Sequence, residues 1–284
     1  GISFFDGDLF FSEINKIWKI ENISKYFSSN LSTLPQKILI TENLPSDEWH
    51  GWKWIKHDRK GNLYTNVGAP CNVCLEDDKR YATILRLNDG TWDYVARGVR
   101  NSVGFDFHPT SQKLYFTDNG RDWLGDDSPS CELNRVDIDG SFYGFPFKHS
   151  MDVIDPEFGN INSGFNFIDP ILELGAHVAP TGISFYQGPM FPEEFQENLF
   201  ITLHGSWNRS QKVGYKVLRI TLNEEGDVVD SEDFITGWLD SQLDEDGNVI
   251  ETVHGRPSAT FIKSDGSMLI SDDKANLIYR VTSL

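Results

Sequence analysis

The feature of this sequence that most constrains its fold is a pair of short patterns that recurs five times along the chain. The first is a turn followed by an apolar strand, and it begins at Gly7, Gly61, Gln112, Glu197 and Gly266. In the second, one basic residue stands between apolar neighbours; it spans Ile17 to Ile20, Ile84 to Leu87, Leu133 to Val136, Val217 to Ile220 and Ile278 to Val281. Such alternation is typical of β-strands, and its recurrence indicates a repeat architecture.

Each pair has the order of the two middle strands of a four-stranded blade, which predicts an all-β protein with the β-propeller fold. Five blades are evident, in a single domain over residues 1–284. Because Gly1 falls just before the inner strands of one blade, we expect the first blade of a six-bladed propeller to be missing or incomplete. A β-sandwich is the alternative, but sandwiches show no repeated strand pair.

Composition excludes several classes of function. With 43 acidic and 25 basic side chains the formal charge is −18, which disfavours a nucleic-acid partner. No stretch approaches the roughly 18 to 20 apolar residues of a membrane span. Cys71 and Cys74 stand in a loop-like segment without a second pair of zinc ligands, so a structural disulfide is favoured over a zinc site or a redox pair; Cys131 is alone.

Three of the five pairs are separated by a longer connection than the other two. The long connections follow Leu63, Leu114 and Leu199. Equivalent connections in a propeller emerge on one face, so we expect these loops to converge on one pocket. They combine Gly with polar, Trp and Arg residues, which indicates a planar, anionic ligand held by stacking and charge.

Several residues near these loops are candidates for the site. Lone arginines are most often surface ion pairs, but a chain of this charge would gather Arg100, Arg121, Arg209 and Arg256 on one face only to hold an anion. His50 suits proton transfer near neutral pH, although a packed structural role is equally compatible with its Trp neighbours. We expect His57 and His108 to be solvated, and His177 and His204 to lie beside the pocket. Oxygen ligands around Gly120 favour calcium, although such Asp-rich loops are more often only solvated.

Five longer runs carry a resemblance to a known family. They are Val99 to Gly104, Asn119 to Asp122 with Gly125 to Asp127, Tyr143 to Pro146, His204 to Arg209 with Gly214 to Val217, and Gly255 to Pro257. Together they resemble the pyrroloquinoline-quinone (PQQ)-dependent sorbosone dehydrogenases, which belong with the soluble quinoprotein glucose dehydrogenases and the fungal pyranose dehydrogenases.

The resemblance implies a six-bladed propeller with the quinone in its axial pocket. It assigns His50 as the general base, Arg100, Asn101 and Arg256 as quinone contacts, and the backbone of Gly120 and Arg121 as calcium ligands. The cofactor-binding set predicted here also includes Arg121, His177, His204, Trp207, Asn208 and Arg209. The glucose enzymes use a Lys that has no counterpart in the His204 to Arg209 run, and Arg209 or Lys216 is expected to replace it.

The predicted function is therefore oxidation of a sugar, sugar alcohol or sugar aldehyde, with PQQ as hydride acceptor and calcium as metal. The alternatives are a calcium-dependent lactonase-like hydrolase and a non-catalytic binding module. A carbohydrate is the expected small-molecule partner, and the family implies a periplasmic or secreted location. The substrate, the electron acceptor and the oligomeric state cannot be read from the residues.

Overall fold

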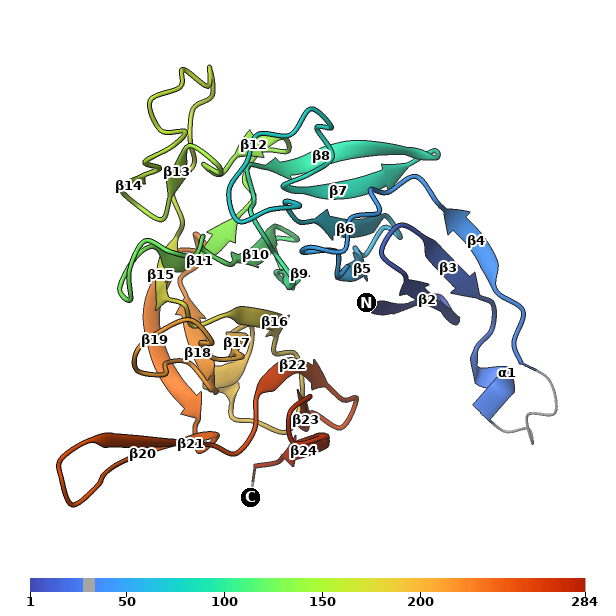
Figure 1. The fold of residues 1–284 in the computed structure, drawn as a ribbon. Helices are drawn as coiled ribbons and strands as arrows, with labels where there is room; N and C mark the ends of the chain where they lie inside the picture. Colours follow the sequence, from blue (N-terminus) through green and yellow to red (C-terminus); the bar gives the residue numbers. More distant parts are fainter. Residues whose placement is uncertain (28–33, 284) are drawn as a thin grey trace. The chain divides into compact units, whose positions relative to one another are not determined.

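The structure is a computed structural model, and it describes residues 1–27 and 34–283. The chain divides into two compact units. Unit 1 comprises Gly1–Val103, Val136–Lys148 and Ile154–Ile168, and unit 2 comprises Gly104–Arg135, His149–Val153 and Asp169–Leu284. Almost all regular structure is β-strand (Figure 1). The described residues include one short α-helix, α1 (Ser24–Phe27), and no helix among them is long and apolar enough to span a bilayer.

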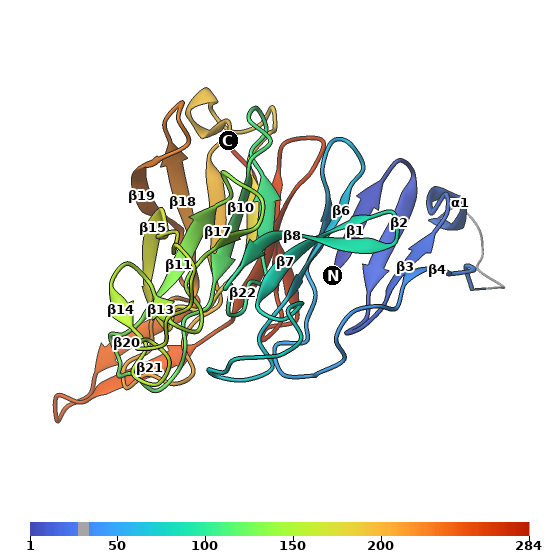
Figure 2. The ribbon, with the colours of Figure 1, turned by 90° about the horizontal axis from the view of Figure 1, so that it is seen from above.

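Unit 1 contains two blades. In the first, four antiparallel strands lie side by side in chain order (Figure 2): β1 (Ile2–Phe5), β2 (Asp8–Ser12), β3 (Ile17–Ile20) and β4 (Ile38–Thr41). The second is built from β5 (Ile55–His57), β6 (Leu63–Val67), β7 (Thr83–Asn88) and β8 (Thr91–Arg97), and β12 (Ser141–Phe142) adds a parallel edge strand to β8.

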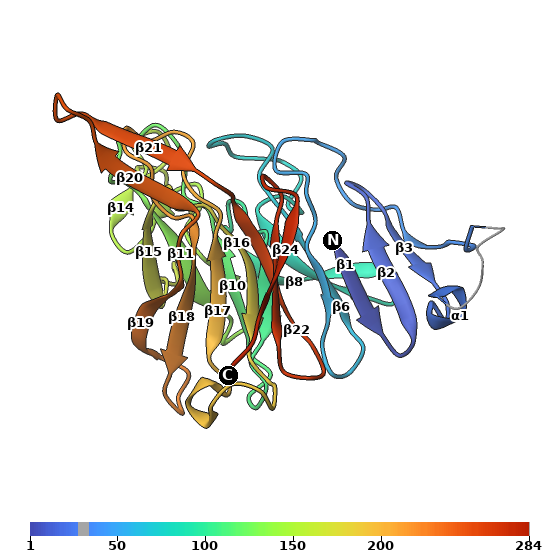
Figure 3. The same ribbon diagram turned by 90° about the horizontal axis from the view of Figure 1, so that it is seen from below.

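Unit 2 contains three blades. The first is formed by β9 (Phe105–Phe107), β10 (Leu114–Asp118), β11 (Ser130–Arg135) and β15 (Leu172–Ala176). The next, visible side by side in Figure 3, is formed by β16 (Pro180–Phe185), β17 (Leu199–Leu203), β18 (Lys216–Leu222) and β19 (Val228–Ile235), with the 3₁₀ helix η1 (Glu193–Phe195) before β17. The last has three strands, β22 (Pro257–Ile262), β23 (Met268–Asp272) and β24 (Leu277–Val281).

The other strands lie outside the blades. β20 (Leu239–Leu243) and β21 (Val249–Val253) form a hairpin in unit 2, and β13 (Lys148–His149) and β14 (Val153–Ile154) are two residues each. The all-β class and the propeller with five blades are confirmed for the described residues. The sixth blade and the single domain stay predictions.

The repeated strand pair is paired in the same way in every blade. The basic residue of the second pattern lies directly opposite an apolar or aromatic residue of the first, as Phe10–Lys19, Tyr64–Arg86, Tyr115–Arg135, Phe200–Arg219 and Leu269–Arg280. Each basic side chain points outward to an ion pair, for example Arg135 with Asp227 at 2.9 Å. The apolar partners of the repeat fill the cores, and β6, β10 and β17 are buried along their whole length.

Connection lengths follow the prediction from the sequence. Residues 13–16 join β2 to β3 and residues 273–276 join β23 to β24, whereas residues 68–82, 119–129 and 204–215 join the three longer pairs. We call these three segments the first, second and third long loops. The first belongs to unit 1, and the second and third belong to unit 2.

Candidate active site

His50 stands on a tight turn that leads into β5. The backbone N–H of Gly51 donates to the carbonyl of Glu48 (2.9 Å), and His50 has a φ of 51°, a left-handed conformation that is uncommon for residues other than glycine. Nδ1 of His50 lies 2.7 Å from the carbonyl oxygen of Ala69. Because that oxygen can only accept, Nδ1 donates the proton and Nε2 retains the lone pair. The turn thus presents an imidazole of defined tautomer.

The surroundings of His50 keep it uncharged. Burial is the main cause, and together with the positive charge of Arg100 it lowers the pKa of His50 to about 4; the hydrogen bond to Ala69 acts in the opposite direction. Nε1–H of Trp49 donates to Nε2 of His50 at 3.2 Å. Trp49 is 58% exposed, so few packing contacts hold this indole in place. His50 is therefore neutral at physiological pH, with one hydrogen bond covering its basic nitrogen.

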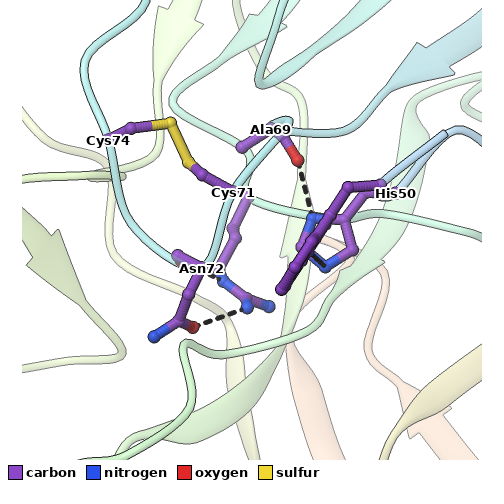
Figure 4. The surroundings of a disulfide bond; sticks show 7 residues. His50, Ala69, Cys71, Asn72 and Cys74 are labelled. Carbon is purple, nitrogen blue, oxygen red and sulfur yellow. Dashed lines mark hydrogen bonds between the residues drawn. A yellow bond between two sulfur atoms is a disulfide. The ribbon is translucent and has the colours of Figure 1, made fainter. Parts of the chain in front are cut away.

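The first long loop, of which Figure 4 labels Ala69, Asn72 and the disulfide-bonded Cys71 and Cys74, holds Arg100 in place. Arg100 is buried, and it donates from Nε to the carbonyl oxygen of Asn72 (2.8 Å) and from Nη2 to Oδ1 of Asn72 (2.9 Å). Asn72 lies between Cys71 and Cys74, whose disulfide confirms the pairing that the sequence favoured. The N–H of Ala69 also donates to the carbonyl of Arg100 (2.8 Å). The same loop therefore orients both His50 and Arg100.

Gly68 allows the first long loop to pass close to His50. A Cβ at Gly68 would lie 2.6 Å from Cβ of His50 and 3.2 Å from Oδ1 of Asn101. The predicted base and the predicted quinone contacts Arg100 and Asn101 are therefore gathered around this loop in unit 1.

In unit 2 the second and third long loops contact each other. Nδ2 of Asn208 donates to the carboxylate of Asp122. Arg209 donates to the carbonyl of Asp126 (2.9 Å) and to the carboxylate of Asp127 (2.7 Å). The predicted convergence is confirmed for these two loops, because three acidic residues of one are paired with two residues of the other.

Aromatic and histidine side chains complete the contact between these loops. Trp123 and Trp207 form a T-shaped pair with ring centres 6.1 Å apart, and both are largely exposed. His177 is buried, and its Nε2 donates to the carbonyl of Gly125 (2.8 Å). His177, which directly follows β15, therefore anchors the second long loop.

Arg256 holds the start of the third long loop. It donates from Nε to the carbonyl of His204 (3.0 Å) and from Nη2 to the carbonyl of Gly205, and its guanidinium lies 5.6 Å from the ring centre of Tyr215. His204 bonds Asp273 through Nε2 (2.9 Å); burial lowers its pKa, while Asp273 raises it.

The turn at Gly120 is packed closely on the chain before β11. A Cβ at Gly120 would lie 3.1 Å from both the Pro129 side chain and the carbonyl oxygen of Ser130, tighter than ordinary van der Waals contact. Arg121, the next residue, is 5% exposed. The second long loop therefore places one small residue and one buried cation at its beginning.

Comparisons with known proteins identify the family. A family model described as TrAA12-like matches residues 160–284. An uncharacterized protein of Borreliella burgdorferi is 38% identical over 291 residues, which cover 99% of this chain and 74% of that protein. The chain therefore belongs to the same family as this relative. The TrAA12-like match and the five sequence runs both support the PQQ sugar dehydrogenase superfamily.

Solved structures share the fold of this chain at low sequence identity. The holo form of the pyranose dehydrogenase PQQ domain from Coprinopsis cinerea has a TM-score of 0.76 at 16% identity, over 98% of this chain and 79% of that one. The calcium structure of a Trichoderma reesei protein of carbohydrate-active enzyme family AA12 has a TM-score of 0.73 at 19% identity, over 99% of this chain and 79% of that one.

The arginines fit the anionic cofactor of this superfamily. PQQ carries three carboxylates, and guanidinium groups are well suited to bind them. Arg256 is held by neutral carbonyls and forms no ion pair within the described chain, so its charge remains available. The oxygen atoms of Asn72 that bind Arg100 are likewise uncharged.

Calcium fits only as a backbone-carbonyl site. In the described part of the chain, no group of three or more His, Cys, Asp or Glu residues could hold a metal ion. The carboxylates of Asp122 and Asp127 are used by the third long loop. Carbonyl oxygens remain as hard ligands of the kind that calcium accepts, and those of Gly120 and Arg121 are the predicted ones.

The two residues expected to replace the quinone-contacting Lys of the glucose enzymes each form an ion pair with a nearby carboxylate. Arg209 is paired with Asp127 at 2.7 Å, and Lys216 with Asp233 at 2.6 Å. Each would have to give up an ion pair to reach a cofactor.

Two histidines are less exposed than the sequence suggested. His57 bonds Ser3 and stacks on Phe5 with ring centres 4.9 Å apart, and His108 packs edge-on against Phe185 at 5.0 Å. The prediction that both are solvated was wrong, because aromatic neighbours on other strands cover their rings.

Sequence reasoning also missed the residues that support the base. Ala69 acts through its backbone carbonyl oxygen, and Asn72 through its backbone carbonyl and its side-chain Oδ1; every residue has a backbone carbonyl, so no sequence signal marks those contacts. Lys53 is buried, donates to the carbonyl of Gly51 (2.7 Å), and burial lowers its pKa to about 8.

Proposed function

We propose that this protein is a quinoprotein oxidoreductase that oxidises a sugar, sugar alcohol or sugar aldehyde, with PQQ as hydride acceptor and calcium as metal. One observation carries the proposal: His50 is a neutral imidazole of fixed tautomer, and the loop that fixes it also holds the buried Arg100. A base and an anion-binding cation in one cluster are what removal of a hydroxyl proton requires.

His50 acts at Nε2 in the proposed reaction. Its Nδ1 proton is held by Ala69, so Nε2 takes the hydroxyl proton of the substrate once the indole of Trp49 has moved aside. When bound, the quinone supplies the hydride acceptor. The positive charge of Arg100 stabilises anionic oxygen beside the base and keeps His50 unprotonated before the reaction.

The cofactor contacts are assigned by charge and by the superfamily. Arg100 and Arg256 would bind carboxylates, and the carbonyls of Gly120 and Arg121 would hold calcium. Asn101 is proposed as a further contact because it lies beside Gly68 and the base. His177, His204, Asn208 and Arg209 are proposed as further cofactor contacts, and each is held by a hydrogen bond within unit 2.

The sugar class is supported by exposed aromatic rings. Trp123 and Trp207 present large apolar faces on loops rich in hydrogen-bonding groups, a combination that suits a ligand with both apolar and polar edges. A sorbosone-type substrate and a periplasmic or secreted location remain proposals that come from the family.

The His50→Gln variant tests the function. The protein is reconstituted with PQQ and calcium, and dye reduction is measured over aldoses and sorbosone. We expect turnover to fall about 10²- to 10⁴-fold in the variant, the usual contribution of a positioned base, with PQQ affinity by calorimetry nearly unchanged. His254→Gln is the matched control, because His254 is exposed and pairs with Asp240 on the β20–β21 hairpin. Unchanged turnover in His50→Gln would remove His50 from the mechanism.

The same assay separates the alternatives. Dye reduction that requires the quinone supports the dehydrogenase, lactone hydrolysis without it supports the hydrolase, and neither activity leaves a binding module.

A further inference from the structure

A pocket of about 290 Å³ lies in unit 1 beneath the first long loop. This volume is near the lower end for small-molecule sites and suits a ligand of one or two rings. Its walls come from the loop, from β8 and from the segment after β12. Six of the lining residues are aromatic: Tyr81, Tyr94, Phe142, Phe145, Phe147 and Phe165.

The aromatic walls favour a planar ligand. Phe142 and Phe165 are stacked with ring centres 4.2 Å apart and an interplanar angle of 8°, and Phe147 lies against Phe142 at 6.0 Å. Phe165 is 41% exposed, so one ring of this stack borders solvent at the pocket. A flat ring bound here would extend an existing stack.

Two hydrogen-bond donors line the same pocket. Arg97 donates from Nε to the carbonyl of Gly140 (2.9 Å) and lies 5.0 Å from the ring centre of Phe165, while its terminal nitrogens bond no group in the described chain. The Tyr94 hydroxyl likewise has no hydrogen-bond partner within the described residues. The Arg97 nitrogens and the Tyr94 hydroxyl can therefore donate hydrogen bonds to a ligand. A ligand with carbonyl oxygens would accept them.

The charged residues that line the pocket balance one another. Lys79 and Arg97 supply two positive charges, and Glu76 and Asp78 supply two negative ones. Arg80 also pairs with both carboxylate oxygens of Asp78. A neutral carbonyl compound fits better than a carboxylate.

We propose that this pocket binds a small neutral quinone, which accepts the electrons of the oxidised substrate. The role as acceptor rests on the proposed function, in which sugar oxidation releases two electrons and two protons to the enzyme. The pocket quinone takes up both electrons and both protons and leaves as a hydroquinone, so the cycle balances. Ala69 lines the pocket and accepts the Nδ1 proton of His50, so the pocket shares a wall with the base.

Calorimetry with duroquinone tests binding on the protein free of PQQ, independently of turnover. All ring carbons of this quinone are substituted, so it does not alkylate the Cys131 thiol. We expect Phe165→Ala and Arg97→Met each to weaken binding about tenfold, the scale of one stacked ring or one charged hydrogen bond. Phe4→Ala and Arg86→Met are matched controls, since both residues are in unit 1 outside the pocket, and should stay within twofold.

Kinetics of the reconstituted enzyme test the role. With duroquinone as acceptor, the two pocket variants should raise KM for duroquinone by the factor seen in calorimetry, with KM for the sugar unchanged. The proposal would be overturned if both pocket variants bound duroquinone as tightly as the wild type does. It would also be overturned if their KM for duroquinone were unchanged. Binding that depends on Phe165 and Arg97 in a protein that oxidises no sugar supports the quinone site and contradicts the proposed function.

Discussion

Nε1 of Trp49 donates a hydrogen bond, 3.2 Å long, to the same nitrogen of His50 that is left basic by the bond between Nδ1 and Ala69. The two ring nitrogens of one histidine are thus both engaged, one by a buried carbonyl and one by an exposed indole. The first contact fixes the tautomer, and the second competes with any proton that approaches Nε2.

Replacing Trp49 by Phe should therefore make His50 a stronger base. Loss of one hydrogen bond to Nε2, roughly 0.5–1.5 kcal/mol, corresponds to a rise of up to about one unit in the pKa of His50. The measurement is an NMR titration of the His50 ring protons in the protein without cofactor. Trp52→Phe is the control, because Trp52 is also exposed and its side chain makes no bond to His50. A pKa that moves equally in both variants would show that the indole hydrogen bond has no specific effect.

The pH dependence of catalysis should reflect the depressed pKa of His50. Because burial and Arg100 favour the neutral form, the base stays unprotonated well below the ordinary histidine value of 6.5. We expect kcat/KM to fall on acidification through about pH 4. An acid limb centred near pH 6.5 would show that burial does not control this residue in the free enzyme.

Stability should depend on pH in the same direction. The pKa of His57 is also lowered to about 4, mainly by burial. Between pH 6.5 and about 4 the unfolded chain binds protons at His50 and His57 that the folded protein does not, so this contribution to stability is lost as the pH falls through that window. Denaturant unfolding at several pH values checks it, and His57→Gln should flatten the dependence.

Gly68→Ala should damage the active site more than the fold. The added Cβ would meet Cβ of His50 at 2.6 Å and its carbonyl oxygen at 2.9 Å, so the turn that carries the base must shift. A misplaced base costs orders of magnitude in rate, whereas a local shift of one turn costs about 1 kcal/mol of unfolding free energy, the usual effect of a point mutation. We expect turnover to fall at least tenfold, about 1.4 kcal/mol, with a small change in Tm. Gly90→Ala is the control for backbone strain alone: no atom lies within 4 Å of the added Cβ, but the φ of 78° disfavours alanine, so Tm should fall while turnover stays unchanged.

The repeat was predictable because its signal is periodic and redundant. Five copies of the strand pair predicted the middle strands of each blade, and the structure pairs these strands with one another in every copy, as in Tyr64–Arg86. The site was less predictable because its supports are single contacts. Nothing in the sequence indicates that Asn72 binds Arg100 through its backbone, or that Lys53 is buried beside Gly51.

The disulfide is expected to matter more for the site than for the fold. Its loop closes over four residues, for which chain entropy contributes only about 2 kcal/mol. Asn72 stands inside that loop and provides two acceptors for Arg100. Replacing Cys71 and Cys74 by Ser should lower Tm modestly while weakening PQQ binding severalfold, as measured by calorimetry and calcium-dependent reconstitution. A large loss of stability with unchanged affinity would contradict this assignment.

Arg256→Lys should weaken cofactor binding although the charge is kept. Arg256 reaches the carbonyls of His204 and Gly205 with two different nitrogens, which the single ammonium of Lys cannot reproduce. Hydrogen bonds from a charged group contribute about 1.5–3 kcal/mol, so we expect PQQ affinity to fall by about 10- to 100-fold. Arg280→Lys, on β24 of the same blade, changes an exposed ion pair with Asp265 and a hydrogen bond to Ser267, neither of which involves the third long loop, and should leave affinity unchanged. If Arg256→Lys binds PQQ as tightly as the wild type, the fork geometry of Arg256 is not what holds the cofactor, and its charge alone would have to be tested with Arg256→Met.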